Sequence, residues 1–241
     1  GTLRPDDWVA GAAPPVPRLS SSEAQRRLSE RGGSPPESAE ECLAVYMAAL
    51  RELFEEAGVL LARPTGQPTA PLDSATWTRL SSTRPEVQAG RSLVQIVLDA
   101  GLTLAPEDLV YFSHWITPAV SPRRYDTRFF VCAAPEGQEV VEDSRELIGT
   151  QWLTPAEALR RHDAGDITMI FPTVRTLVAL SRFDRADAVL DHARAQSRVE
   201  GILPTISDGD DGMRIVLPGD PEDVGGVYDA WTARPLSPDH D

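Results

Sequence analysis

The sequence contains no lysine: its 23 fixed positive charges are all arginines, and they stand against 37 aspartates and glutamates. The net charge of −14 and the sequence pI of about 4.7 argue against a nucleic-acid backbone or an anionic membrane as a partner. We attribute the absence of lysine to a GC-rich genome. Arginine nevertheless suits bidentate binding of phosphate, so a local arginine cluster in this acidic chain is informative.

Cysteine is also scarce, since Cys42 and Cys132 are the only two. Two isolated cysteines form no metal-binding pattern, and we expect reduced, packed thiols in a cytoplasmic protein. No apolar run approaches the ~20 residues of a membrane span, and no secretory signal is evident. A hydrophobic content of 41% over 241 residues allows a sizeable core.

Three carboxylates are concentrated in residues 51–59, Arg-Glu-Leu-Phe-Glu-Glu-Ala-Gly-Val. Glu52, Glu55 and Glu56 are spaced i, i+3 and i+4, so a helix places them on one face. The apolar residues that fall on the opposite face are Leu43, Met47, Leu50, Phe54 and Ala57. Ser38 with Glu41 forms a capping-box pattern, and Gly58 is a C-terminal cap, so the sequence predicts a helix over 38–57.

Such a face admits two interpretations. Most acidic helix faces are simply solvated, because glutamate is a good helix former. Alternatively, a divalent cation would remove the repulsion between the like charges, and three hard oxygen donors suit Mg²⁺ or Mn²⁺.

The rest of the chain alternates between helical and strand patterns, which is typical of the α/β class. Thr154 and Pro155 predict a helix start by their capping chemistry. The Asp/Gly-rich residues 208–212 predict a hairpin turn and not a calcium loop, because they lack the distant acidic ligand of an EF-hand. The other predicted helices are 22–31, 85–100, 173–181 and 185–198, and the predicted strands are 59–62, 109–115, 125–133, 146–153, 199–206 and 213–217.

Residues 51–59 match every fixed position in the central part of the Nudix hydrolase signature. Further segments resemble the Nudix branch that includes the peroxisomal and mitochondrial acyl-coenzyme A diphosphatases: 114–118, 122–130, 152–159 and 171–173. The resemblance extends over about residues 50 to 180. It implies a Nudix-type α/β/α sandwich with a mixed sheet, extra helices and a long insertion before the catalytic helix.

The resemblance also implies a domain organisation. Residues 1–37 correspond to the insertion, 38–182 to the Nudix hydrolase domain and 183–241 to a C-terminal extension. The chain departs from the general signature at Leu43, where a glutamate is usual. If Gly1 is the last glycine of the turn found in this branch, Asp6 or Asp7 follows it as in those relatives. We then expect the strands that precede this turn to lie outside the chain and a sheet edge to be left unpaired.

The activity implied by the resemblance is metal-dependent hydrolysis of a diphosphate in coenzyme A or acyl-coenzyme A. Glu52, Glu55 and Glu56 are the implied ligands of Mg²⁺ or Mn²⁺, and the implied catalytic residues are Arg51, Glu52 and Glu55. Glu146 is a candidate for a further carboxylate, with an exposed strand charge as the alternative. Two other functions stay open: hydrolysis of ADP-ribose or a dinucleotide, and a non-catalytic ligand-binding module.

Arg124, Asp126 and Arg128 share one face of the strand predicted at 125–133, because side chains alternate along a strand. Arg124 and Arg128 therefore either bind substrate phosphate or form an Arg–Asp–Arg ion-pair ladder. For His114, a structural role in the interior is favoured over contact with a base or proton transfer.

Overall fold

The computed structural model describes residues 2–8, 18–29, 38–67, 69–138, 151–209, 212–217, 227–230, 233, 234 and 236. Its contacts divide the chain into two compact units. Unit 1 comprises residues 1–111 and 130–151, and unit 2 comprises residues 112–129 and 152–241. The domain boundaries implied by the resemblance, after residues 37 and 182, fall elsewhere and stay a prediction.

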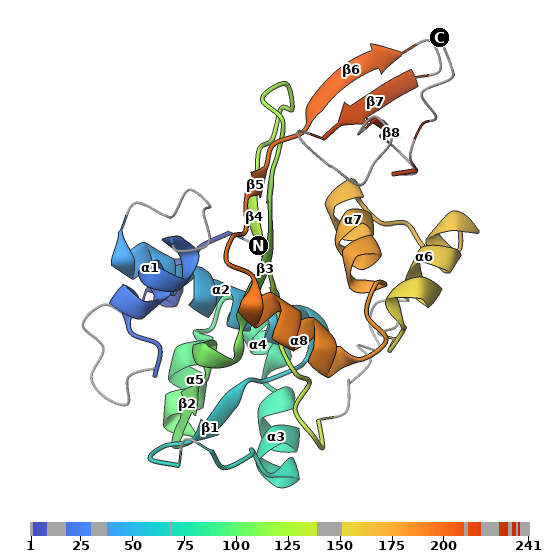
Figure 1. Ribbon diagram of the computed structural model, residues 1–241. Helices are drawn as coiled ribbons and strands as arrows, with labels where there is room; N and C mark the ends of the chain where they lie inside the picture. Colours follow the sequence, from blue (N-terminus) through green and yellow to red (C-terminus); the bar gives the residue numbers. More distant parts are fainter. Residues whose placement is uncertain are drawn as a thin grey trace. The chain divides into compact units, whose positions relative to one another are not determined.

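Unit 1 is built around α2 (Ala39–Ala57), with α1 (Ser21–Ser29) packed along it (Figure 1). The Ser38 hydroxyl accepts a hydrogen bond from the backbone N–H of Glu41 at 3.0 Å. At the other end Gly58 adopts a left-handed φ of 69°, and its N–H donates to the Phe54 carbonyl. The helix predicted at 38–57 and both of its caps are therefore confirmed.

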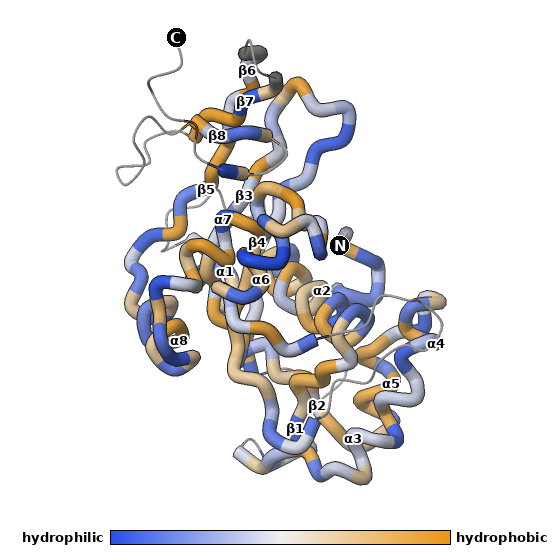
Figure 2. The backbone as a smooth tube through the Cα atoms, turned by 90° about the vertical axis from the view of Figure 1, so that its right-hand side faces the viewer, coloured by the Kyte–Doolittle hydropathy of each residue, from blue (hydrophilic) through white to orange (hydrophobic). Residues whose placement is uncertain are grey.

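The helix predicted over 85–100 is wrong, because two shorter helices occupy this stretch: α4 (Arg84–Gln88) and α5 (Leu93–Asp99). Gly90 lies between them with a φ of 99°, which a right-handed helix cannot accommodate. The Ser92 hydroxyl then caps α5 by accepting from the N–H of Gln95. Apart from Gln95 and Asp99, α5 is apolar (orange in Figure 2). In a continuous helix, Val87 of α4 would share a face with these apolar residues, and this made the two helices look like one.

The remaining elements of unit 1 are short. They are η1 (Pro5–Asp7), β1 (Ala62–Pro64), α3 (Ser74–Ser81), β2 (Leu102–Leu104) and η2 (Pro106–Asp108). Strands β1 and β2 pair antiparallel with Ala62 opposite Leu104, so the strand predicted at 59–62 begins only at Ala62. Neither α3 nor β2 was predicted from the sequence.

A three-stranded sheet has the order β4-β3-β5, where β3 is Val110–Ile116, β4 is Asp126–Val131 and β5 is Gly201–Ile202. Strands β3 and β4 confirm the predictions at 109–115 and 125–133. Strand β5 lies parallel to β3, with Gly201 opposite His114. A Cβ atom on Gly201 would lie 3.0 Å from the Ile116 Cδ1 atom and 3.1 Å from the His114 Nδ1 atom, so glycine permits this close approach.

Unit 2 contains the helices α6 (Pro155–Asp163), α7 (Phe171–Leu180) and α8 (Ala186–Ala195). The Thr154 hydroxyl caps α6 as predicted, accepting from the N–H of Glu157 at 3.2 Å. An antiparallel sheet has the order β6-β7-β8, formed by Thr205–Gly209, Gly212–Val216 and Val227–Asp229. Gly209 is opposite Gly212, which confirms the predicted hairpin.

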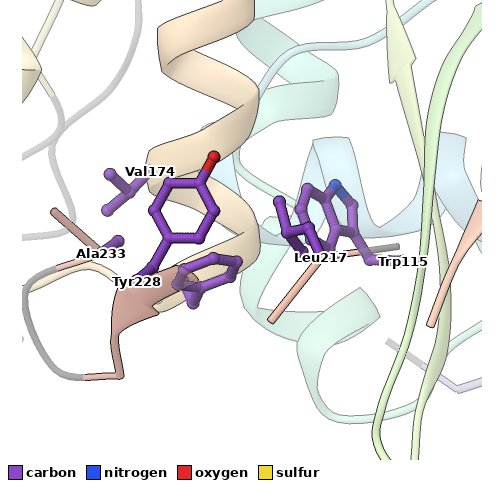
Figure 3. Packing of buried hydrophobic residues seen from close by; sticks show 6 residues of the cluster. Trp115, Val174, Leu217, Tyr228 and Ala233 are labelled. Atoms are coloured by element: carbon purple, nitrogen blue, oxygen red, sulfur yellow. The ribbon is translucent and has the colours of Figure 1, made fainter. Parts of the chain in front are cut away.

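The hydrophobic core of unit 2 joins β3 and α7 to the β7–β8 region (Figure 3). Trp115 meets the Phe171 ring edge-on at 5.8 Å, and Phe171 meets Tyr228 in the same way at 5.5 Å. The buried members of this cluster are Trp115, Phe171, Val174, Leu217, Tyr228 and Ala233.

The mixed α/β class is confirmed. Within residues 2–8 and 18–29, the described part of the N-terminal region, there is no strand, as expected for an insertion. The strand predicted at 146–153 falls mostly outside the described residues, and residues 151–153 have no regular structure. No helix in the described ranges has both the length and the apolar character to cross a membrane.

Candidate active site

The end of α2 is organised around Arg51, which is 1% exposed. A guanidinium carries five N–H donors, and here all five have acceptors. The Nε and Nη2 atoms donate to the two Asp7 carboxylate oxygens at 2.9 and 3.1 Å, and Nη2 also donates to the Thr2 carbonyl at 2.9 Å. The Nη1 atom donates to Glu52 Oε1 at 2.6 Å and to Glu55 Oε2 at 3.1 Å. One arginine therefore fixes two of the three predicted glutamates.

The segment 2–7 brings these acceptors to the helix. Its turn η1 is closed by the Asp7 carboxylate, which accepts from the backbone N–H of Arg4 at 2.7 Å. Arg4 itself reaches Glu55, donating through Nη1 at 2.6 Å and through Nη2 at 3.2 Å. Asp7, one of the two aspartates expected to follow the glycine turn, is thus the buried partner of Arg51. Gly1 lies outside the described residues.

The three predicted glutamates have different surroundings. Glu55 is buried, at 7% exposure, between Arg4 and Arg51. The side chain of Glu52 is 24% exposed and pairs with Arg51, whereas Glu56 is exposed to solvent. The periodicity correctly placed the three residues together, but it did not show that residues 2–7 cover the middle one.

Arg84 adds a positive charge at the same end of the helix. Its guanidinium donates to the main-chain carbonyls of Glu55 at 2.8 Å and Glu56 at 2.6 Å, and Gln88 also donates to the Glu55 carbonyl. A cation at this position satisfies C-terminal carbonyls and interacts favourably with the helix dipole. Sequence reasoning missed Arg84, because no local pattern connects it to residues 29 positions earlier.

The carboxylates around Arg51 explain why this arginine stays charged although it is buried. Burial alone would lower the pKa of Arg51, but the hydrogen bonds and charges of Asp7 and Glu52 outweigh it and raise that pKa above its ordinary value. The arginine is thus a permanent cation.

The oxygen-rich chemistry of this cluster fits a hard divalent cation. Glu52 and Glu56 lie one helical turn apart and retain access to solvent. Within the part of the chain that the structure describes, no group of three or more His, Cys, Asp or Glu side chains is close enough together to hold a metal ion by itself. A metal here would therefore take protein ligands from few residues and the remainder from substrate or water, as Mg²⁺ commonly does.

The second set of predicted residues lies in unit 2. Arg128 donates to Asp126 at 3.1 Å, and the buried His114 is bonded to the same carboxylate oxygen. Arg124 precedes β4 and donates to the Thr117 carbonyl at 3.2 Å. The Arg–Asp half of the ladder is therefore formed by Arg128, while Arg124 takes another partner. His114 is fully buried, as the structural alternative requires.

Burial opposes ionisation of Asp126, but the hydrogen bond from His114 and the charge of Arg128 lower the pKa of its carboxyl group below the ordinary value. Glu146 lies outside the described residues, so its role stays a prediction.

A mixed α/β fold with a helix that ends in an arginine-organised cluster of glutamates defines the class of the Nudix hydrolases. Residues 17–180 match the family described as the NUDT19 Nudix domain, and the chain belongs to this family. The structure is similar to a NUDIX hydrolase from Alicyclobacillus acidocaldarius, with a TM-score of 0.54 and 26% identity over 79% of this chain and 78% of the other. This likeness confirms the predicted Nudix-type fold.

Curated relatives extend the comparison. The chain is 32% identical to the acyl-coenzyme A diphosphatase NUDT19 of Homo sapiens over 75% of its own length and 51% of the relative. It is 30% identical to the protein of the same name from Xenopus laevis, over 75% of this chain and 52% of the relative. The chain thus spans about half the length of the curated relatives that it matches.

Proposed function

We propose that the protein hydrolyses the diphosphate linkage of coenzyme A or acyl-coenzyme A in a reaction that depends on Mg²⁺ or Mn²⁺. The observation that carries this proposal is the arginine-centred cluster on α2, in which Arg51 holds Glu52 and Glu55 while Glu56 faces solvent. The choice of substrate rests on the relatives named acyl-coenzyme A diphosphatase.

The contacts favour different roles for the three glutamates. Glu52 and Glu56 are the candidates for direct metal ligands, because both retain access to solvent. Glu55 has both carboxylate oxygens in hydrogen bonds with arginines, so its candidate role is to hold Arg51 and Arg4 in place. Arg51 then positions Glu52 and does not contact substrate.

The charge balance supports a divalent cation. The described cluster has four carboxylates, those of Asp7, Glu52, Glu55 and Glu56, and three guanidinium groups, those of Arg4, Arg51 and Arg84, so its charges sum to −1. Arg84 adds its charge to the main-chain carbonyls beside them. When bound, the metal would neutralise diphosphate oxygens and lower the pKa of a water molecule that attacks phosphorus.

Arg124 and Arg128 stay candidates for substrate phosphate. Arg128 is already paired with Asp126, whereas Arg124 is exposed and its described bond is to a main-chain carbonyl. Arg124 is therefore the better candidate of the two.

The test is a substrate panel. The protein is incubated with Mg²⁺ or Mn²⁺ and coenzyme A, octanoyl-coenzyme A, ADP-ribose or diadenosine polyphosphate, and the products are identified by mass spectrometry. We expect adenosine 3′,5′-bisphosphate and a 4′-phosphopantetheine species from the first two substrates. Faster cleavage of ADP-ribose would change the substrate assignment, and binding without turnover of any compound would favour a non-catalytic module.

A further inference from the structure

A pocket in unit 2 is lined by none of the glutamates of α2, and the proposed diphosphatase activity makes no use of it. Its volume is about 310 Å³, at the lower end of the range for small-molecule sites. Its apolar wall includes Phe112 and Trp115 of β3, Ile202 of β5 and Leu217 after β7. Figure 3 shows Trp115 and Leu217 side by side.

Three polar side-chain atoms in the lining are buried, and no described residue gives them a hydrogen-bond partner: Trp115 Nε1, Ser113 Oγ and Thr176 Oγ1. The Trp115 side chain carries most weight, because the residue is only 6% exposed and its indole N–H can only donate. Buried donors in native proteins almost always have an acceptor. A ligand with an acceptor group would give the Trp115 N–H the partner that it lacks.

The charged side chains that line the pocket indicate which kind of acceptor group the ligand would carry. Arg175 and Arg182 both line the pocket, and none of its described lining residues is acidic. The Arg175 guanidinium lies 4.4 Å from the centre of the Tyr228 ring, which fixes its position by a cation–π contact. In a chain with a net charge of −14, two arginines in the lining of one pocket favour an anionic ligand over a neutral one.

We propose that this pocket binds a small aliphatic carboxylate. Its hydrocarbon chain would pack on the apolar wall, and its carboxylate would accept hydrogen bonds from Trp115 Nε1 and Thr176 Oγ1 in the field of the two arginines. This inference is independent of diphosphate hydrolysis, because none of the lining residues belongs to the glutamate cluster.

The experiment titrates the full chain with octanoate by isothermal calorimetry and follows the tryptophan side-chain N–H signals by NMR. We expect saturable binding and a shift of the Trp115 signal. Trp115→Phe removes the donor and should weaken binding about tenfold, as the loss of a hydrogen bond to a charged group requires. Thr176→Val tests a second donor on another element, so the test stands even if Trp115→Phe folds poorly.

Trp152→Phe is the matched control, since Trp152 is 70% exposed and does not line the pocket. Its affinity for octanoate should equal that of the unaltered protein. Equal affinity in Trp115→Phe and Thr176→Val would overturn the proposal, as would the absence of saturable binding. Equal binding of 1-octanol would refute the role of the carboxylate, and tighter binding of S-octanoyl-N-acetylcysteamine would show that the pocket takes an acyl thioester instead.

Discussion

Arg51 and Asp7, 44 positions apart in the sequence, bind each other through two parallel hydrogen bonds, and each side chain is at most 3% exposed. Paired geometry of this kind is among the strongest polar contacts in proteins. Because the same guanidinium also binds Glu52 and Glu55, the position of the glutamates depends on an aspartate from the start of the chain.

Asp7→Asn should therefore destabilise the protein by roughly 3 kcal/mol, because it leaves the buried charge of Arg51 undercompensated. Urea denaturation followed by circular dichroism measures this change. Asp6→Asn is the control, since Asp6 precedes it in the same turn and is only partly buried. Equal midpoints for the two variants would contradict the importance of the pair.

Glu56→Gln should reduce metal-dependent turnover at least ~100-fold by weakening a direct metal ligand. Its stability should hold or rise slightly, because a repulsion between like charges one turn apart on the helix is removed. Glu40→Gln, on the exposed first turn of the same helix, should retain full turnover. Unchanged rates in Glu56→Gln would refute the proposed role.

Phe54→Ala should cost roughly 3–5 kcal/mol of stability, because the side chain is 0% exposed. Affinity for Mn²⁺ in the folded fraction should change little, since Phe54 lies on the side of α2 away from Glu56. Leu53→Ala, at the half-buried neighbouring position, should cost less. Thermal melting and a Mn²⁺ titration by electron paramagnetic resonance separate the two effects, and an unaltered melting temperature would show that the helix faces are misassigned.

Asp126 should make unfolding sensitive to acid. Its folded-state pKa lies below the ordinary value of 3.8, so its contribution to stability is complete above that value and is lost as the pH falls through the folded-state pKa. Asp126→Asn should therefore flatten the decline of melting temperature below about pH 4. Asp166→Asn, an exposed aspartate of unit 2, is the comparison variant. Parallel curves for Asp126→Asn and the unaltered protein would contradict the stabilising role.

Local signals allowed much of the fold to be predicted. Ser38 and Gly58 set the ends of α2, and Thr154 set the start of α6, because capping is chemistry between near neighbours. The failure at 85–100 had a local cause as well, since Gly90 and Ser92 carry the signals for a break that the apolar pattern concealed.

The candidate site could be predicted only in part. The spacing of Glu52, Glu55 and Glu56 follows from helical geometry alone. The burial of Glu55 does not, because it depends on Arg4 and Asp7, which are 51 and 44 positions away in the sequence from the residues that they bind. Arg84 was missed for the same reason. Contacts that join distant segments leave no periodic trace in a single sequence.

The five acceptors around Arg51 also bear on the order of folding. The helix α2 can form from local contacts, but Arg51 lacks its Asp7 and Thr2 acceptors until residues 2–7 dock. That docking closes a loop of more than forty residues. The free-energy cost of that closure is offset only when Asp7 and Thr2 accept their hydrogen bonds from Arg51. We therefore expect assembly of the candidate active site to follow the formation of the helix that carries its glutamates.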